Sequence, residues 1–73
     1  MILLISEEAT GRVKVKSING VDHLIVPIKK LDTEQEVSNM VRGRSISGIK
    51  INGTLNKKQY MLLNTYLLPI MSQ

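Results

Sequence analysis

The alternation of apolar and basic positions is clearest at residues 12–16, where it predicts a half-buried β-strand. Asn19-Gly20 follows, a dipeptide that favours the type I′ turn because this turn matches the right-handed twist of paired strands. A second run of strand-forming residues covers 21–26 and stops at Pro27, which has no N–H to give to a ladder. Residues 12–26 are therefore predicted to form a β-hairpin.

The two-residue turn fixes which side chains of this hairpin share a face. The predicted opposite pairs are Ile18 with Val21, Val15 with Leu24, and Val13 with Val26. The apolar face then carries Val13, Val15, Leu24 and Val26. The other face carries Arg12, Lys14, Lys16 and His23.

The rest of the chain predicts further strands and two helices. Residues 1–5 form an apolar run typical of a strand buried on both faces, and residues 6–11 are expected to be a loop. Asp32 or Thr33 begins a short helix that Gly43 ends, because an acceptor side chain caps the first turn and glycine tolerates the conformation after the last. Residues 46–51 predict an extended segment before the second Asn-Gly pair, Asn52-Gly53.

The last predicted element is a strongly apolar helix over about residues 57–68. Asn56 and Gln59 have the spacing of a capping box, and Pro69 ends the helix. Its apolar residues cover more than one stripe, so it should be buried on most sides or face another chain. Such self-association would use Tyr60, Leu63 and Leu67. The predicted fold class is α+β: a small antiparallel sheet with an Asn-Gly hairpin and two helices.

Length and composition set limits on this domain. The chain has 73 residues and no cysteine, so we expect one domain, 1–73, without disulfides or thiolate metal sites. No apolar run approaches the roughly 20 residues that span a bilayer, and the N-terminal run has no secretory pattern. We therefore expect a cytoplasmic protein. Ten basic and six acidic residues give a net charge of +4, which favours acidic partners.

The residues needed for catalysis do not form a recognisable set. His23 is the only histidine and is expected at the surface or rim of the hairpin. Glu34 and Glu36 lie in the first turn of a predicted helix, where the positive end of the helix dipole stabilises negative side chains. The segment 43–48 contains two glycines but lacks the Gly-Lys-Ser/Thr ending of a phosphate loop. The sequence therefore predicts a non-enzyme without a cofactor or metal ion.

Basic residues are the candidates for partner binding. The first group, on the hairpin face, is Arg12, Lys14 and Lys16. The second group is Arg42, Arg44, Lys50, Lys57 and Lys58. Lys57 and Lys58 oppose the dipole at a helix N-terminus, so stability alone does not explain them. Both tyrosines belong to the C-terminal helix and leave no stacking platform for single-stranded nucleic acid, although contact with duplex phosphates stays open.

Two resemblances bear on function. Residues 22–27 (DHLIVP), followed by Lys29-Lys30-Leu31, resemble the strand and proline of the AbrB/MazE swapped-hairpin DNA-binding family, without its preceding Gly-Arg pair. The small size, basic charge and lack of catalytic residues resemble bacteriophage host-takeover proteins that bind RNA polymerase as inhibitors or antiterminators. This second resemblance implies a polymerase subunit or associated factor as partner. We therefore expect a regulator that docks on the host transcription machinery; a DNA-binding regulator and a homo-oligomeric structural subunit are the alternatives.

Overall fold

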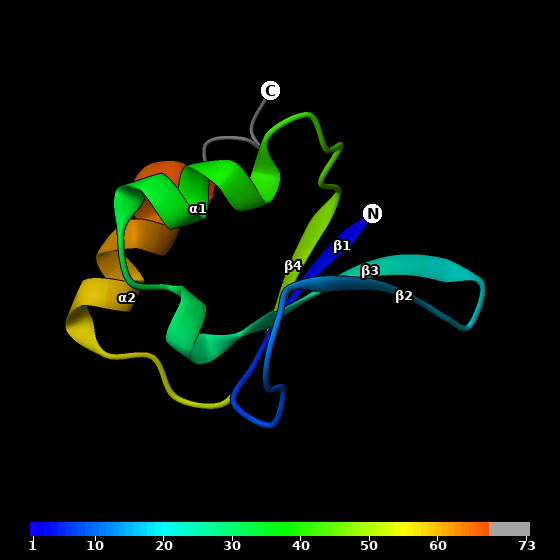
Figure 1. Cartoon of the computed structure of the whole chain (residues 1–73), viewed down its shortest axis with the longest axis horizontal. Helices are drawn as coiled ribbons and strands as arrows, with labels where there is room; N and C mark the ends of the chain where they lie inside the picture. Colours follow the sequence, from blue (N-terminus) through cyan, green and yellow to red (C-terminus); the bar gives the residue numbers. More distant parts are fainter. Residues whose placement is uncertain (68–73) are drawn as a thin grey trace.

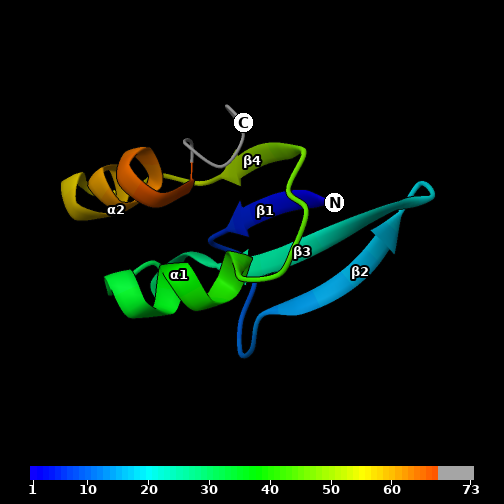
Figure 2. The same ribbon diagram turned by 90° about the horizontal axis from the view of Figure 1, so that it is seen from above.

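The computed structural model describes residues 1–67, which form a four-stranded sheet with helical segments on one side of it (Figure 1). In chain order the elements are β1 (Ile2–Ser6), β2 (Lys14–Ile18), β3 (Val21–Pro27), the 3₁₀ turn η1 (Ile28–Lys30), α1 (Glu34–Val41), β4 (Gly48–Asn52), α2 (Lys57–Leu62) and the π-helical η2 (Leu63–Leu67). Seen from above, α1 lies toward β3 and α2 toward β4 (Figure 2). The fold class is α+β, as predicted.

The sheet is mixed, so the predicted purely antiparallel sheet is wrong. Its strand order is β2-β3-β1-β4, and β1 runs parallel to both β3 and β4. Only β2 and β3 are antiparallel. Parallel strands need a long crossover connection, and the segment containing α1 supplies one from β3 to β4, which lie on either side of β1. The continuous apolar run of β1 fits its central position between two strands.

The strands β2 and β3 are joined at Asn19-Gly20, where both residues have positive φ angles, 53° and 79°. These values lie in the left-handed region that a type I′ turn requires at both central positions. In the ladder Ile18 lies opposite Val21 and Val15 opposite Leu24. The regular strand begins only at Lys14, so Arg12 and Val13 precede it.

The core lies between one face of the sheet and the helices. It is built from buried side chains of β1, β3, α1 and the C-terminal helical segments, among them Leu3, Ile5, Leu24, Val26, Val37, Met40, Leu62, Leu63 and Leu67. Full burial of a side chain of this size contributes about 1.5–3 kcal/mol each relative to exposure. Most of the buried apolar side chains among the described residues thus lie in this single layer between the sheet and the helices.

Side-chain caps begin both α-helices where the sequence predicts them. Thr33 Oγ1 accepts a hydrogen bond from the Glu36 N–H at 3.1 Å, so Thr33 rather than Asp32 is the N-cap of α1. Asn56 Oδ1 accepts from the Gln59 N–H at 2.8 Å, and Gln59 Oε1 accepts from the Asn56 N–H at 2.9 Å. The predicted capping box of α2 is confirmed.

The C-terminal helix departs from the uniform α-helix predicted for residues 57–68. Its α-helical part ends at Leu62, and Leu63–Leu67 continue as a π-helix. It is also buried on one side only, since Tyr60 and Met61 are 51% and 61% exposed. The predicted end near residue 68 lies outside the described residues. No helix within residues 1–67 has the length and apolarity to cross a membrane.

Candidate binding surfaces

The sheet face that points away from the core carries lysines on both sides of an apolar centre. Neighbouring side chains on a strand point to opposite faces, so the residues between the core positions share this second face. One ladder row across it contains Lys14, Ile25, Leu4 and Lys50. The next row contains Lys16, His23, Ile2 and Gly48.

We call this surface the lysine face, defined by Lys14, Lys16, Lys50, Ile2, Leu4 and Ile25. Its lysines are exposed and belong to the two edge strands, β2 and β4. Its apolar side chains belong to the two central strands and are half-buried or buried. Among the described residues no helix covers it, because both helices lie on the other side of the sheet (Figure 1).

Arg12 does not continue the row of Lys14 and Lys16, contrary to the sequence prediction. The strand starts at Lys14, so the alternation that would place Arg12 on the same face does not extend to it. Arg12 instead lines a hollow of about 420 Å³ whose other wall is α1. We call it the arginine hollow; its lining residues are Arg12, Val13, Lys30, Glu36, Asn39, Met40 and Arg44.

The arginine hollow gathers three cations from distant parts of the chain. Arg12 precedes β2, Lys30 ends η1, and Arg44 follows α1. All three side chains are exposed, and within residues 1–67 none of them forms an ion pair. Lys30 was not a sequence candidate, because nothing local to it indicates that Arg12 and Arg44 lie nearby.

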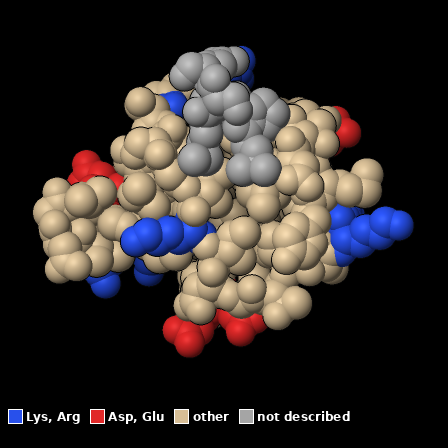
Figure 3. Space-filling view, turned by 180° about the vertical axis from the view of Figure 1, so that it is seen from behind, with Lys and Arg blue, Asp and Glu red and all other residues tan. Residues whose placement is uncertain are grey.

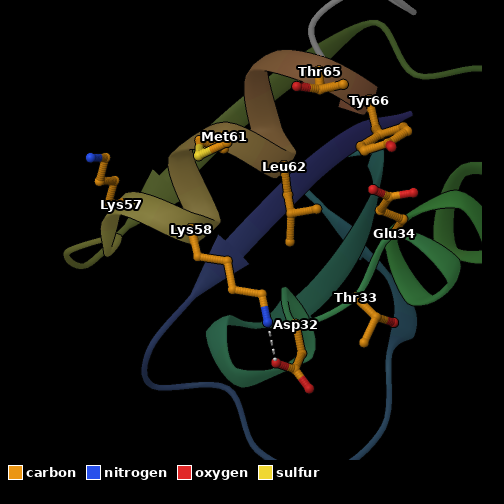
Figure 4. Close-up of a pocket in the computed structure, with 9 residues that line it drawn as sticks. All are labelled: Asp32, Thr33, Glu34, Lys57, Lys58, Met61, Leu62, Thr65 and Tyr66. Atoms are coloured by element: carbon orange, nitrogen blue, oxygen red, sulfur yellow. Dashed lines mark hydrogen bonds and ion pairs between the residues drawn. The ribbon is translucent and has the colours of Figure 1, made fainter.

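Lys57 and Lys58 lie at a third place, beside a hollow of about 600 Å³ between α2 and the start of α1 (Figure 4). Lys58 Nζ lies 3.3 Å from Asp32 Oδ1, and both side chains are more than 60% exposed. An exposed pair of this kind contributes little stability, typically about 0–1 kcal/mol. It still gives Lys58 a local partner that the sequence did not reveal, whereas Lys57 points away from the pair.

Tyr66 and Glu34 face each other across the same hollow (Figure 4). A hydrogen bond to the Glu34 carboxylate raises the pKa of the Tyr66 hydroxyl above its ordinary value of 10.0, and lost hydration and the Glu34 charge add to this. The neutral phenol donates to the carboxylate, so its loss of a proton would place two negative charges side by side. This contact links η2 to the first turn of α1.

The predicted surface position of His23 is wrong. Its side chain is only 6% exposed, and Nδ1 lies 2.8 Å from the Val21 carbonyl oxygen. The reason is the sheet order: β3 has a neighbour on each side, so His23 lies between Lys16 on β2 and Ile2 on β1. The segment that resembles the AbrB/MazE strand is thus an internal strand paired on both sides within its own chain.

The predicted self-association face also needs correction. Leu63 is 5% and Leu67 1% exposed, because both pack into the core. Of the three residues proposed for self-association only Tyr60 lies at the surface, where Met61 accompanies it. Most apolar side chains of the described part of the helix therefore pack into the core of their own domain.

The structure thus divides the predicted partner-binding residues among separate places. Lys14 and Lys16 lie on the lysine face, Arg12 and Arg44 line the arginine hollow, and Lys57 and Lys58 flank the hollow beside α2. Arg42 is exposed at the C-cap of α1 and lines none of these hollows. Seen from behind, Lys and Arg side chains form separated groups and not one continuous patch (Figure 3).

Titratable side chains that could bind a metal ion do not cluster: within the described part of the chain no group of three or more His, Cys, Asp or Glu residues lies close enough together. Comparison of the chain with protein family models, curated proteins and solved structures finds no match.

Proposed function

We propose that the chain is a non-enzymatic regulatory protein that binds a large intracellular assembly through its lysine face, and that this assembly is the transcription machinery, with RNA polymerase as the direct partner. The observation that carries the proposal is the arrangement of Lys14, Lys16 and Lys50 around an apolar centre on the face that the described helices leave open.

This arrangement suits a protein partner. Protein interfaces commonly place apolar side chains at the centre and charged ones at the rim, where solvent remains accessible. Three lysines at the rim attract an acidic surface and accelerate its encounter with the face. The apolar centre, with Leu4 and Ile25, then gives contact area that a purely electrostatic site lacks.

The choice of RNA polymerase rests on the resemblance in size, basic charge and lack of catalytic residues to small bacteriophage proteins that take over host transcription. The mixed sheet adds a physical reason to prefer protein docking to reading DNA bases. Base-specific readout in the major groove uses a helix or a two-stranded ribbon that fits the groove. Here the exposed basic residues of the sheet lie on the two edge strands of a four-stranded layer.

The test is a binding titration of the full chain against purified bacterial RNA polymerase, together with an in vitro transcription assay for inhibition or antitermination. Lys14→Ala/Lys16→Ala should weaken binding on the order of tenfold, because it removes two attractive rim charges. Arg42→Ala/Lys57→Ala removes the same charge outside the lysine face and should retain most of the affinity. Size-exclusion chromatography checks that both variants stay monodisperse, since lysines on edge strands also discourage aggregation.

Two results would contradict the proposal. The first is absence of binding between the wild-type chain and polymerase at low salt. The second is equal loss of affinity in the two double variants, which would indicate a general charge effect with no role for the lysine face.

A further inference from the structure

We propose that the arginine hollow is a separate anion site, and that it holds a backbone phosphate of duplex DNA. This inference does not depend on the lysine face or on a polymerase partner. It rests on the convergence of Arg12, Lys30 and Arg44 on one hollow of about 420 Å³.

The first argument is the charge state of the hollow. Its three cations come from segments 18 and 14 residues apart along the chain (12 to 30 and 30 to 44), so the fold and not local sequence brings them together. One acidic residue, Glu36, also lines the hollow, but within residues 1–67 it forms no ion pair with any of the three. Glu36 lies in the first turn of α1, where the positive end of the helix dipole stabilises its negative charge. The hollow therefore keeps a net charge of +2.

The second argument is the chemistry of the donors. Each arginine presents a planar fork of N–H groups that matches phosphate oxygens, and lysine adds a compact positive charge. A carboxylate holds its two oxygens in one plane with the carbon, whereas the two charged oxygens of a phosphodiester are part of a tetrahedral group and accept hydrogen bonds from a wider range of directions. Donors that approach from three separate segments are therefore better satisfied by phosphate. Val13 and Met40 supply an apolar part of the wall that a deoxyribose ring can contact.

The third argument concerns the surroundings of the arginine hollow, which favour a contact with the nucleic-acid backbone over a contact with bases. A second hollow of about 500 Å³ adjoins the first and shares Lys30 and Glu36 with it. This second hollow adds Lys29 and Glu7, so its two lysines are balanced by Glu7 and Glu36, and the net positive charge is confined to the arginine hollow. Among residues 1–67 no aromatic side chain lines either hollow, so these residues offer no platform on which bases could stack. The expected contact is with the duplex backbone and independent of base sequence.

The expected dependence of DNA affinity on salt concentration follows from counterion release. One neutralised phosphate gives a slope of about −0.9 for log affinity against log salt concentration, so affinity should fall about 3- to 4-fold between roughly 50 and 200 mM salt. A site of this size should bind weakly, and its salt dependence is the measurable signature. Removing two of the three cations should bring the slope toward zero, because the phosphate is then no longer neutralised.

The experiment titrates labelled duplex DNA of two unrelated sequences with the full chain over this salt range. Arg12→Ala/Arg44→Ala should lower affinity at low salt by at least tenfold and flatten the slope, with equal effects on both sequences. Arg42→Ala/Lys57→Ala is the matched control, because it removes the same charge from residues outside both hollows, and it should retain most of the affinity. Amide chemical shifts of the variants, compared with wild type, check that the fold is kept.

Other probes identify the occupant. Inorganic phosphate alone should perturb the amide resonances of residues around Arg12 and Arg44 only at far higher concentration than DNA. If polyglutamate binds as tightly as DNA and loses the same affinity in Arg12→Ala/Arg44→Ala, the occupant is a carboxylate and the proposal is wrong. It is also overturned if wild type does not bind duplex DNA at low salt, or if the two double variants weaken binding equally. Because Lys14 and Lys16 are untouched in both variants, polymerase binding can succeed or fail independently of these results.

Discussion

Replacing Gln59 with methionine should destabilise the fold by about 2 kcal/mol, because the side chain makes two hydrogen bonds at about 1 kcal/mol each. Gln59 is a buried polar residue, 8% exposed. Its Oε1 accepts from the Asn56 N–H at 2.9 Å, and its Nε2 donates to the Ile28 carbonyl oxygen at 3.1 Å. The second bond joins α2 to η1, so the residue links the helical layer to the end of β3. Methionine keeps nearly the same volume and makes neither bond.

This loss is large for so small a domain. A core of this size typically leaves about 3–5 kcal/mol of net stability, so the variant should stay folded with little margin. For a domain of this length about 2 kcal/mol corresponds to a fall in Tm of roughly 8–16 °C. Urea denaturation followed by circular dichroism measures the change, and the m-value should not change.

Gln35→Met is the matched control for this prediction. Gln35 is exposed on α1 and makes a single long bond, 3.4 Å, to Asn39 Oδ1. Its replacement should change stability by less than about 0.5 kcal/mol. If Gln59→Met were as mild as Gln35→Met, the claim that Gln59 joins α2 to η1 would be refuted.

Three further outcomes are expected. The pKa of Tyr66, followed by NMR of its ring, should lie above 10.0 and fall toward that value in Glu34→Gln. Because the pKa is higher in the folded state, the Tyr66–Glu34 contact stabilises the fold below the unfolded pKa near 10, and this stabilisation is lost as pH rises through the folded pKa. Tyr66→Phe should therefore remove this loss of stability at alkaline pH. Gly53→Ala should destabilise the fold by about 1 kcal/mol or more, because Gly53 has φ 133° and an added Cβ would meet the Glu7 carboxylate at 2.7 Å. Adding Glu7→Ala should remove the destabilisation due to this contact but not that due to the backbone angle, and thermal melts measure both. Leu24→Ala should cost about 2–5 kcal/mol, a large part or all of the stability of the domain, so the same melts should show a much lower Tm or no folding transition, since Leu24 is fully buried.

The accuracy of the sequence prediction depended on how local each signal is. The caps at Thr33 and Asn56 were predictable because the donor and acceptor of each cap lie three residues apart along the chain. The start of β2 was misplaced by two residues, since alternation of apolar and basic residues continues through Arg12 although the strand does not. That error put Arg12 on the wrong surface.

The positions of His23, Leu63 and Leu67 were misjudged for a different reason. Each lies against a partner distant in sequence: His23 beside Ile2 of β1, and the two leucines within the core shared with β1, β3 and α1. A single strand or helix pattern shows which side chains share a face, but it does not show what covers that face. The strand neighbours were therefore needed to decide which residues are buried.

The sequence by itself determined the local features of this protein: the capped starts of both helices, the turn residues Asn19-Gly20, and the alternation that separates Lys14 and Lys16 from the core. Tertiary structure alone decided that β1 lies between β3 and β4 in parallel, which places Lys50 across the sheet from Lys14. It alone also brought Arg12, Lys30 and Arg44 to one hollow. The physical reason is that caps and turns are satisfied by hydrogen bonds within a few residues, whereas strand order and surface clusters follow from packing between segments far apart in the chain.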